Sequence, residues 1–277
     1  MQSIERAVWF IETHFSDEIS LDDIAEFGGV SRFHMSRSFG SITGSPVMTY
    51  VRGRRLTTAA EKLLNGAPDI LAIALDAGYN SHEAFTRAFR DQFGQTPEQT
   101  RATSSLDTSR LVPPLRIDQT LVADLEPPRL ETGPVLLVAG LSERFTFNAS
   151  EGIPALWQRF APYIDNVPGQ IGHVTYGVCA NTDDTCAFDY IAVVEVKDFS
   201  DLAPELVHLR IPQQRYAVFS HRGHISAMRR TAYTIWAHYL PQSTLEPIDA
   251  PNFERYGDQY DPQTGNGTVE VWVPIRS

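Results

Sequence analysis

The chain has 277 residues, of which 42% are hydrophobic and 21% are charged. This length and composition predict one large or two ordinary packed domains, and they exclude a disordered chain. The net charge of −11 argues against a protein that coats nucleic acid nonspecifically.

The N-terminal segment MQSIERAVWFIE lacks the basic start and apolar run of a secretory signal. The chain also lacks the run of about 18 apolar residues that a transmembrane helix needs. The two cysteines, Cys179 and Cys186, are then expected to be reduced thiols that pack in the core rather than zinc ligands. We therefore expect a cytoplasmic protein that contacts no membrane and needs no metal or cofactor.

Residues 1–103 show helical spacing of apolar residues and contain an internal repeat. The segment LDDIAEFGGVSRFHMSRSFGSITGSP is matched by ILAIALDAGYNSHEAFTRAFRDQFGQTP further along the chain. In each copy a short helix is followed by a turn glycine, Gly29 or Gly78, and then by Ser31 or Ser81 as the N-cap of a second helix. Each copy therefore predicts a helix-turn-helix.

The segment between the copies predicts one long helix from Pro46 to Leu64, with Ser45 as its N-cap and Gly66 after its end. Such a helix is about 28 Å long, close to the roughly 34 Å between successive major grooves on one side of DNA. One chain could thus place two recognition helices in adjacent grooves.

After a Ser-, Thr- and Pro-containing linker at 104–120, residues 121–277 alternate strand-like runs with two helical segments. The order predicts an α+β domain built from a duplicated β-α-β-β unit, with a concave groove between its halves. Residues 104–277 carry 13 basic and 21 acidic side chains, against 10 and 13 in residues 1–103. The second domain thus has little electrostatic reason to contact DNA.

The first domain resembles the DNA-binding domain of the AraC/XylS family of transcription regulators. The resemblance rests on IALDAGYNSHEAFTRAFRDQFGQTPEQTR at 73–101, with IAEFGGVSRFHMSRSFGSITGSP and a following R-R-L in the first copy. It implies an all-α domain with two helix-turn-helix units joined by a linker helix, bound to double-stranded DNA.

The family's base-reading positions fall on two sets of residues in this chain. In the first recognition helix they are Arg32, Phe33, Ser36 and Arg37. In the second they are His82, Glu83, Thr86 and Arg87. Arginines at such positions can bind guanine in a bidentate manner, and Glu83 can accept from cytosine. Arg90, Arg54 and Arg55 are candidates for phosphate contacts, with the alternative that Arg54 and Arg55 simply solvate the linker helix.

The second domain resembles the GyrI-like, or Rob-type, effector-binding domain in YAVFSHRGHISAMRRTAYTIWAHYLPQS, APNFERY and VEVWVPI. The resemblance places the family's ligand-binding glutamate at Glu254. Alternation along the strands adds Tyr256, and in the last strand Glu270 and Trp272. Further candidate walls of the site are Tyr176, Tyr190, Trp157 and Trp236. A carboxylate beside aromatic faces suits a cationic or amphipathic effector.

These features predict a non-enzymatic transcription regulator, an activator that contacts RNA polymerase and responds to a small molecule. Two alternatives stay open: an orphan regulator whose second domain binds a protein partner, and a small-molecule hydrolase tethered to DNA. His221 and His224 are the residues that keep the hydrolase in view, although the sequence has no G-x-S-x-G, P-loop or H-E-x-x-H motif.

Overall fold

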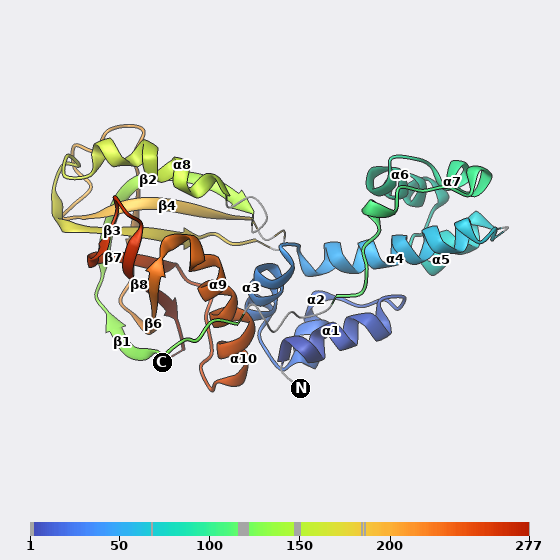
Figure 1. Cartoon of the computed structure of the whole chain (residues 1–277), viewed down its shortest axis with the longest axis horizontal. Coiled ribbons are helices and arrows are strands. Elements are labelled where there is room, and N and C mark those ends of the chain that lie inside the picture. The colour runs from blue at the N-terminus through green and yellow to red at the C-terminus, as the bar shows by residue number, and fades with distance from the viewer. Residues whose placement is uncertain are drawn as a thin grey trace. The chain divides into compact units, whose positions relative to one another are not determined.

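The computed structural model describes residues 3–67, 69–115, 122–146, 151–183, 185 and 187–276. The chain forms two compact units (Figure 1). The helical unit comprises residues 1–35 and 46–117, and the sheet unit comprises residues 36–45 and 118–277. The segment Ser36–Ser45 belongs to the sheet unit, although the sequence predicts one continuous domain over 1–103.

The described part of residues 1–103 is helical, as the sequence predicts, and one 3-10 turn follows within the predicted linker. The helices are α1 (Ser3–His14), α2 (Leu21–Gly28), α3 (Arg32–Thr43), α4 (Val47–Leu64), α5 (Ile70–Asp76), α6 (His82–Phe93), α7 (Pro97–Thr103) and the 3-10 turn η1 (Thr108–Arg110). Two short-helix, turn, long-helix pairs result, α2 with α3 and α5 with α6, and α4 lies between them in the chain.

Both predicted turn glycines adopt the left-handed conformation that a side chain disfavours, with φ of 72° at Gly29 and 79° at Gly78. Ser81 is the N-cap of α6, and its hydroxyl accepts a hydrogen bond from the Ala84 amide at 3.1 Å. The sequence thus located the turns of both pairs correctly.

The start of α4 differs from the prediction. Pro46 is the N-cap residue and provides no side-chain cap, and Ser45 lies outside the helix. The Ser45 amide instead donates to the Thr43 hydroxyl at 3.0 Å, because the tight connection from α3 to α4 uses that group locally.

The second helical pair is built on an apolar core. Its buried side chains come from α4, α5 and α6: Leu56, Ala59, Ala60, Leu63, Ile70, Ile73, Ala74, Ala77, Phe85, Phe89 and Phe93. The Phe85, Phe89 and Phe93 rings follow one another along α6 with centroid separations of 5.6 and 4.6 Å. Their spacing fixes which face of α6 turns inward and which remains for solvent.

The predicted linker is bound to α4 in the part that the structure describes. The Val112 amide donates to the Thr57 hydroxyl at 2.9 Å, and the Val112 carbonyl accepts from Arg54 at 3.0 Å. Gly53 leaves room for Val112, since a Cβ at Gly53 would lie 2.7 Å from its side chain. Residues 116–120 of the predicted linker lie outside the described residues.

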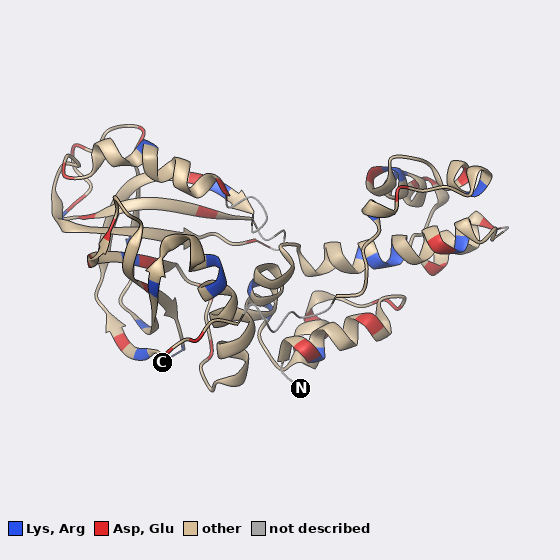
Figure 2. Cartoon of the chain, in the orientation of Figure 1, with Lys and Arg blue, Asp and Glu red and all other residues tan. Residues whose placement is uncertain are grey.

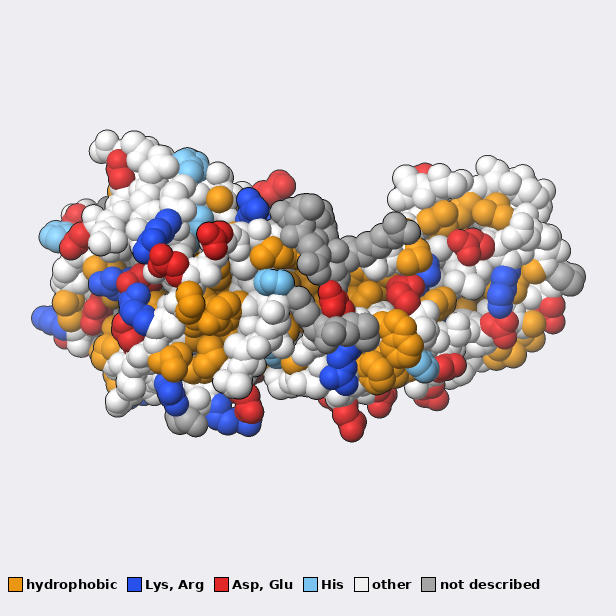
Figure 3. All heavy atoms as spheres, turned by 60° about the horizontal axis from the view of Figure 1, so that its bottom comes forward, with side chains coloured by type: hydrophobic (Ala, Val, Ile, Leu, Met, Phe, Trp, Pro, Cys, Tyr) orange, Lys and Arg blue, Asp and Glu red, His pale blue; other side chains and the backbone are white. Residues whose placement is uncertain are grey.

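Aromatic side chains join α1 to α2. The Phe27 ring stacks on Trp9 at 5.7 Å and on Phe10 at 4.7 Å. Trp9 is 49% exposed, and Figure 3 shows that apolar side chains also gather in several places on the protein surface. Among the described residues, no helix has both the length and the apolar character needed to cross a membrane.

The sheet unit contains one antiparallel sheet of eight strands in the order β1-β6-β8-β7-β3-β4-β2-β5. The strands are β1 (Arg129–Gly133), β2 (Leu136–Thr146), β3 (Gln170–Ala180), β4 (Ala187–Val196), β5 (Val207–Ile211), β6 (Gln214–His224), β7 (Asn252–Asp261) and β8 (Asn266–Pro274). The remaining elements are α8 (Ile153–Phe160), η4 (Ala161–Tyr163), η5 (Ile225–Ala227), α9 (Met228–Tyr233), the π-helix η6 (Thr234–Tyr239) and α10 (Leu240–Gln242).

The two faces of the sheet have separate cores. On one face α8 packs against β2 and β4, with Leu156 and Phe160 fully buried among Phe145, Phe188 and Tyr190. The opposite face gathers side chains from β2 through β8, including Tyr176, Tyr216, Phe253 and Trp272. We call the first the helix-covered face and the second the inner face.

Candidate functional site

The second recognition helix, α6, presents most of its predicted DNA-reading side chains to solvent. Glu83, Arg87 and Arg90 are exposed, whereas His82 and Thr86 are half-buried. The His82 ring lies 2.8 Å from the carboxylate of Glu98 on α7. The face opposite the phenylalanines thus carries two arginines that can reach a groove, with one acid beside them.

The first recognition helix, α3, departs from the prediction. Arg32 is exposed and forms an ion pair with Asp22 at 3.0 Å, and Phe33 is half-buried. Ser36 and Arg37 were expected to face outward, but they are only 8% and 4% exposed. Helical spacing marked them as polar surface positions, whereas contacts within the sheet unit bury them.

Side chains of the sheet unit hold the Arg37 guanidinium. Its Nη2 donates to Asn252 Oδ1 at 2.9 Å, and its Nη1 donates to Thr182 Oγ1 at 3.0 Å. Its Cζ lies 5.1 Å from the ring centre of Trp236 and 5.8 Å from that of Phe188. We call Asn252, Thr182, Trp236 and Phe188 the Arg37 binding site.

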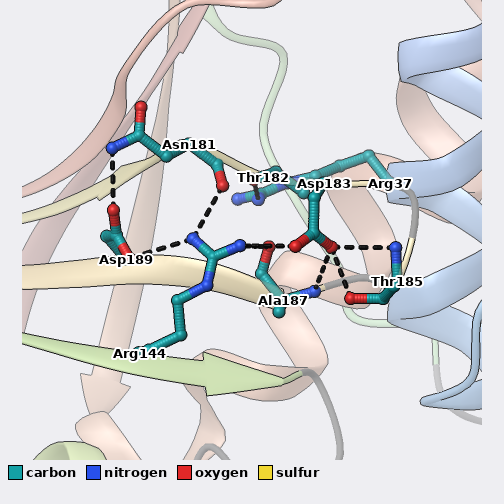
Figure 4. A network of polar contacts seen from close by, with 8 residues as sticks. All are labelled: Arg37, Arg144, Asn181, Thr182, Asp183, Thr185, Ala187 and Asp189. Carbon is teal, nitrogen blue, oxygen red and sulfur yellow. Dashed lines mark hydrogen bonds and ion pairs between the residues drawn. The ribbon is translucent and has the colours of Figure 1, made fainter.

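A polar network braces the loop that carries Thr182 (Figure 4). Arg144 on β2 donates to the Asn181 carbonyl and to Asp189, both at 2.9 Å, and to Asp183 at 2.6 Å. Asp183 also accepts from the Thr185 hydroxyl at 2.6 Å. The loop between β3 and β4 is thereby tied to β2, which fixes the position of the Thr182 hydroxyl.

The candidate phosphate contacts on α4 need correction. Figure 2 shows basic residues in the middle of this helix. Arg54 is 9% exposed and pairs with Glu12 at 3.1 Å, and Arg55 donates to the carbonyls of Phe15 and Asp17. Both side chains stabilise the helical unit, whereas Arg52 is exposed.

The predicted ligand glutamate, Glu254, lies at the centre of a compact aromatic group on the helix-covered face. Its Oε2 accepts hydrogen bonds from the Tyr190 and Tyr256 hydroxyls, each at 2.7 Å. Trp157 on α8 donates from Nε1 to the Tyr190 oxygen at 3.1 Å, and its ring meets Tyr256 edge-on at 5.3 Å. We call Glu254, Tyr190, Tyr256 and Trp157 the Glu254 cluster.

Gly177 on β3 makes room for this cluster. It pairs in register with Glu254 on β7 and with Ala192 on β4. A Cβ at Gly177 would lie 2.0 Å from the Tyr190 hydroxyl and 2.9 Å from Glu254 Oε2. Gly177 was not among the predicted site residues, although a glycine inside a strand is a recognised sign of a close approach.

Burial raises the pKa of the Glu254 carboxyl above its usual value. Hydrogen bonds from Tyr256 and Tyr190, and the charge of Arg37, oppose this effect. Burial and the nearby carboxylate also raise the pKa values of Tyr190 and Tyr256 well above that of a free tyrosine, so both hydroxyls remain donors at neutral pH. The cluster is a buried acid whose charge is stabilised by neutral donors.

Three of the predicted ligand-site residues lie on the other face. Arg255 pairs in register with both Tyr176 and Glu270, which places these side chains on the inner face, opposite Glu254. Trp272 stacks on Phe253 at 5.3 Å within the inner core. The expectation that Glu270, Trp272 and Tyr176 would line one site with Glu254 was therefore wrong.

Glu270 has partners of its own on the inner face. It accepts from Arg129 at 2.6 Å, from Arg255 at 3.3 Å and from Trp272 at 3.1 Å. Burial alone would raise the pKa of Glu270. The hydrogen bonds from Arg129 and Trp272 outweigh this effect and bring the pKa below its usual value. The charge of Glu270 is thus neutralised by its arginine partners, and its carboxylate stabilises the fold.

The histidines that kept a hydrolase in view serve the fold. His221 is 3% exposed, its Nδ1 lies 2.7 Å from the Thr231 hydroxyl, and its Nε2 lies 3.2 Å from the His224 carbonyl. Burial lowers the pKa of His221, which favours its neutral form. Within the described ranges, no three His, Cys, Asp or Glu side chains gather as a metal site would require.

Cys179 is a free thiol, and burial raises its pKa to about 11. This agrees with the expected packing role. Cys186 lies outside the described residues.

A cavity of about 290 Å³ lies in the helical unit, lined by residues of α4 and α5. Its charged groups are already satisfied, since Lys62 pairs with Asp76 at 2.7 Å and Arg55 is bonded to backbone carbonyls. The cavity therefore offers no uncompensated charge to a ligand.

Two parts of the chain match known domain families. Residues 126–276 match the model of the GyrI-like small molecule binding domain, and residues 24–103 match that of a helix-turn-helix domain of AraC type. The transcriptional regulator Rob of Salmonella typhimurium is 27% identical over 97% of this chain and 96% of its own length.

Two further relatives each match one part of the chain. The regulatory protein SoxS of Salmonella typhimurium is 34% identical over 36% of this chain and 94% of its own length. The transcriptional regulator BrlR of Pseudomonas aeruginosa is 31% identical over 53% of this chain and 54% of its own length. The buried acid on the sheet and the paired helices thus fall within two matched domains, and the chain belongs to the family of GyrI-like small molecule binding domains, here joined to an AraC-type helix-turn-helix domain as in AraC-family transcription regulators.

Proposed function

We propose that this chain is a transcription regulator that binds double-stranded DNA through α3 and α6 and senses a lipophilic cation at the Glu254 cluster. The observation that supports the ligand most strongly is the buried carboxylate of Glu254, which accepts hydrogen bonds from two tyrosine hydroxyls, one of which also accepts from Trp157. The match of residues 126–276 to the GyrI-like small molecule binding domain supports the same proposal.

The electrostatics of the cluster favour a cation over an anion or a neutral molecule. A buried carboxylate with a raised pKa carries an unfavourable desolvation energy, and a bound positive charge would offset it. Each aromatic face adds about 0.5–2 kcal/mol of cation–π attraction to a desolvated cation. A ligand with a delocalised charge and apolar substituents would meet both requirements. Trp236 stays a candidate wall of the same site through its place beside Arg37.

The DNA-binding part of the proposal rests on the two helical pairs. At 18 residues, α4 has a length of about 27 Å, which suits helices that enter successive major grooves. Arg87 and Arg90 are exposed on α6 and can reach bases and phosphates, respectively. Arg32, Phe33, Ser36 and Arg37 remain the proposed contacts of α3, and His82, Glu83 and Thr86 those of α6.

We also propose domain boundaries, a cellular location and a protein partner for this chain. We assign DNA binding to residues 1–103, the linker to 104–120 and effector binding to 121–277, in a cytoplasmic activator that contacts RNA polymerase. The strand order is unchanged when β1–β4 are exchanged with β5–β8 and read from the other end. This symmetry supports a duplicated unit, to which β1 and β5 add an edge strand each.

Calorimetry tests the ligand proposal. Tetraphenylphosphonium is a lipophilic cation, and triphenylphosphine oxide is a neutral molecule with similar phenyl faces. We expect the full chain to bind the cation at one site per chain and not the oxide, and we expect Glu254→Gln to lose that binding. Equal binding of the cation by wild type and Glu254→Gln would contradict the proposal.

The two alternative functions predict other outcomes. An orphan regulator would bind no small molecule but would retain DNA binding. A tethered hydrolase would turn over an ester or amide substrate continuously, whereas a sensor binds its ligand stoichiometrically.

A further inference from the structure

We propose that α3 is an internal, reversible occupant of the sheet unit: seating of Arg37 in its binding site and binding of a cation at the Glu254 cluster exclude each other, so that the effector frees a DNA-reading arginine. This inference rests on the proposed function. It assigns the means by which the ligand site would control DNA binding.

The seated arginine is not available to DNA. Bidentate contact with guanine needs two guanidinium nitrogens, but Nη1 and Nη2 already donate to Thr182 and Asn252. The side chain is 4% exposed, and its neighbour Ser38 is fully buried and donates to the Trp236 carbonyl at 2.6 Å. Reading a base with Arg37 therefore requires that this part of α3 leave the sheet unit.

The Arg37 binding site is chemically similar to a cation site. It offers two neutral oxygen acceptors and two aromatic rings to a planar, delocalised cation. Guanidinium is weakly hydrated, so transfer into such surroundings is less costly than transfer of an ammonium group. The arrangement thus uses on Arg37 the same attractions that we propose for the effector.

The two sites adjoin on one face of the sheet. Asn252 and Glu254 are alternate residues of β7, so their side chains lie on the same face. Cys179 on β3 is in register with Asn252 on β7. Besides burial, the charges of both Arg37 and Glu254 act on the pKa of the Cys179 thiol, the first lowering it and the second raising it. Phe188 and Tyr190 are likewise alternate residues of β4, one in each site.

This proximity makes the two cations compete. The positive charge of Arg37 already stabilises the ionised form of Glu254. A second cation beside Glu254 would use the same carboxylate and would repel the guanidinium across a region of low dielectric.

The experiment weakens the Arg37 binding site without changing α3 or the Glu254 cluster. The test variant is Thr182→Val with Asn252→Ala, which removes both acceptors. The matched control is Thr264→Val with Asn266→Ala; these exposed side chains bond Asp261 and the Thr264 carbonyl at the connection from β7 to β8. DNA affinity is measured by gel shift on a duplex selected by the full chain from a random library, and ligand affinity by calorimetry with tetraphenylphosphonium.

We expect the test variant to bind the duplex about tenfold more tightly than wild type without ligand, within the range typical of coupled sites. Because coupling is reciprocal, its affinity for tetraphenylphosphonium should rise by a similar factor. Amide hydrogen exchange over Ser36–Ser45 should be faster in the test variant, and faster in wild type when the ligand is added. The control variant should match wild type in all three measurements.

Unchanged DNA affinity and unchanged exchange over Ser36–Ser45 in a folded test variant would overturn the inference. The two proposals fail separately. Absence of tetraphenylphosphonium binding to wild type would contradict the proposed effector class, while the ligand-free DNA affinity and the exchange rates would still decide whether α3 is held in this way.

Discussion

At the scale of single residues, the two glutamates of the predicted ligand site, Glu254 and Glu270, have opposite effects on the stability of the fold. Glu254 is on the helix-covered face, and burial raises its pKa. Glu270 is on the inner face, and its hydrogen bonds with Arg129 and Trp272 lower its pKa. The raised pKa means that ionised Glu254 costs stability, whereas the lowered pKa means that ionised Glu270 stabilises the fold.

Glu254→Gln should raise the free energy of unfolding at neutral pH by on the order of 1 kcal/mol, because it removes a desolvated charge and retains an oxygen for the tyrosines. The pKa of Glu254 in wild type is higher in the folded state than in the unfolded state. Wild type therefore loses stability as the pH rises from the unfolded-state pKa to the folded-state pKa. The gain should vanish at acidic pH, where Glu254 is protonated in both states. Urea unfolding at several pH values measures it.

Glu270→Gln serves as the control of opposite sign. Its carboxylate stabilises the fold above the pKa of the unfolded chain, and this contribution is lost as pH falls through the lowered folded-state value. The substitution should therefore reduce the free energy of unfolding at neutral pH. If both variants changed stability in the same direction, the distinction between the two faces would be incorrect.

Gly177→Ala should reduce the free energy of unfolding by about 1–3 kcal/mol, because its methyl group would overlap the Tyr190 hydroxyl. The affinity for tetraphenylphosphonium should fall with it, since the same methyl group approaches Glu254. Gly257→Ala is a suitable control, as its nearest neighbour is the flexible end of Arg255. Thermal unfolding and calorimetry check both effects, and equal stability of the two variants would count against the close approach.

At the scale of secondary structure elements, the sequence located the helices and their turns because these depend on local signals. Helical spacing and the positions of Gly29, Gly78 and Ser81 are fixed by residues close together in the chain. The edge strands β1 and β5 were missed. Both are five residues long and largely exposed, so they lack the apolar runs by which the central strands were recognised.

The site residues were only partly predictable, for a reason that also lies at this scale. Alternation correctly grouped Glu254 with Tyr256, and Glu270 with Trp272. Which of these groups share a face depends on the register between β7 and β8, where Glu254 pairs with Val271. A shift of one residue in register exchanges the faces, and periodicity within single strands does not contain that information. The burial of Arg37 likewise depends on partners more than 140 residues away.

Helix α6 gives the clearest test of the DNA-binding face. Arg87→Ala should weaken binding to a selected duplex by about 10- to 100-fold, the effect of losing one bidentate base contact. The variant should fold normally, since Arg87 is exposed. Arg159→Ala, on α8, is the control for a change in net charge. Gel shift at physiological salt measures both, and equal affinities would exclude α6 as a reading helix.

At the scale of the whole molecule, DNA and the sheet unit compete for one arginine, Arg37. DNA binding requires Arg37 to be free, and the sheet unit offers it acceptors and aromatic rings beside a buried carboxylate. An excess of 11 negative charges gives the chain little nonspecific attraction to DNA. The state of α3 should therefore have a large share in the total affinity.

The most direct test is the affinity of the wild-type full chain for a selected duplex, measured by fluorescence anisotropy with and without saturating tetraphenylphosphonium. The account predicts that the ligand raises DNA affinity by about tenfold and that Glu254→Gln shows no such change. An affinity that stays the same, or falls, while calorimetry shows the ligand bound would contradict it.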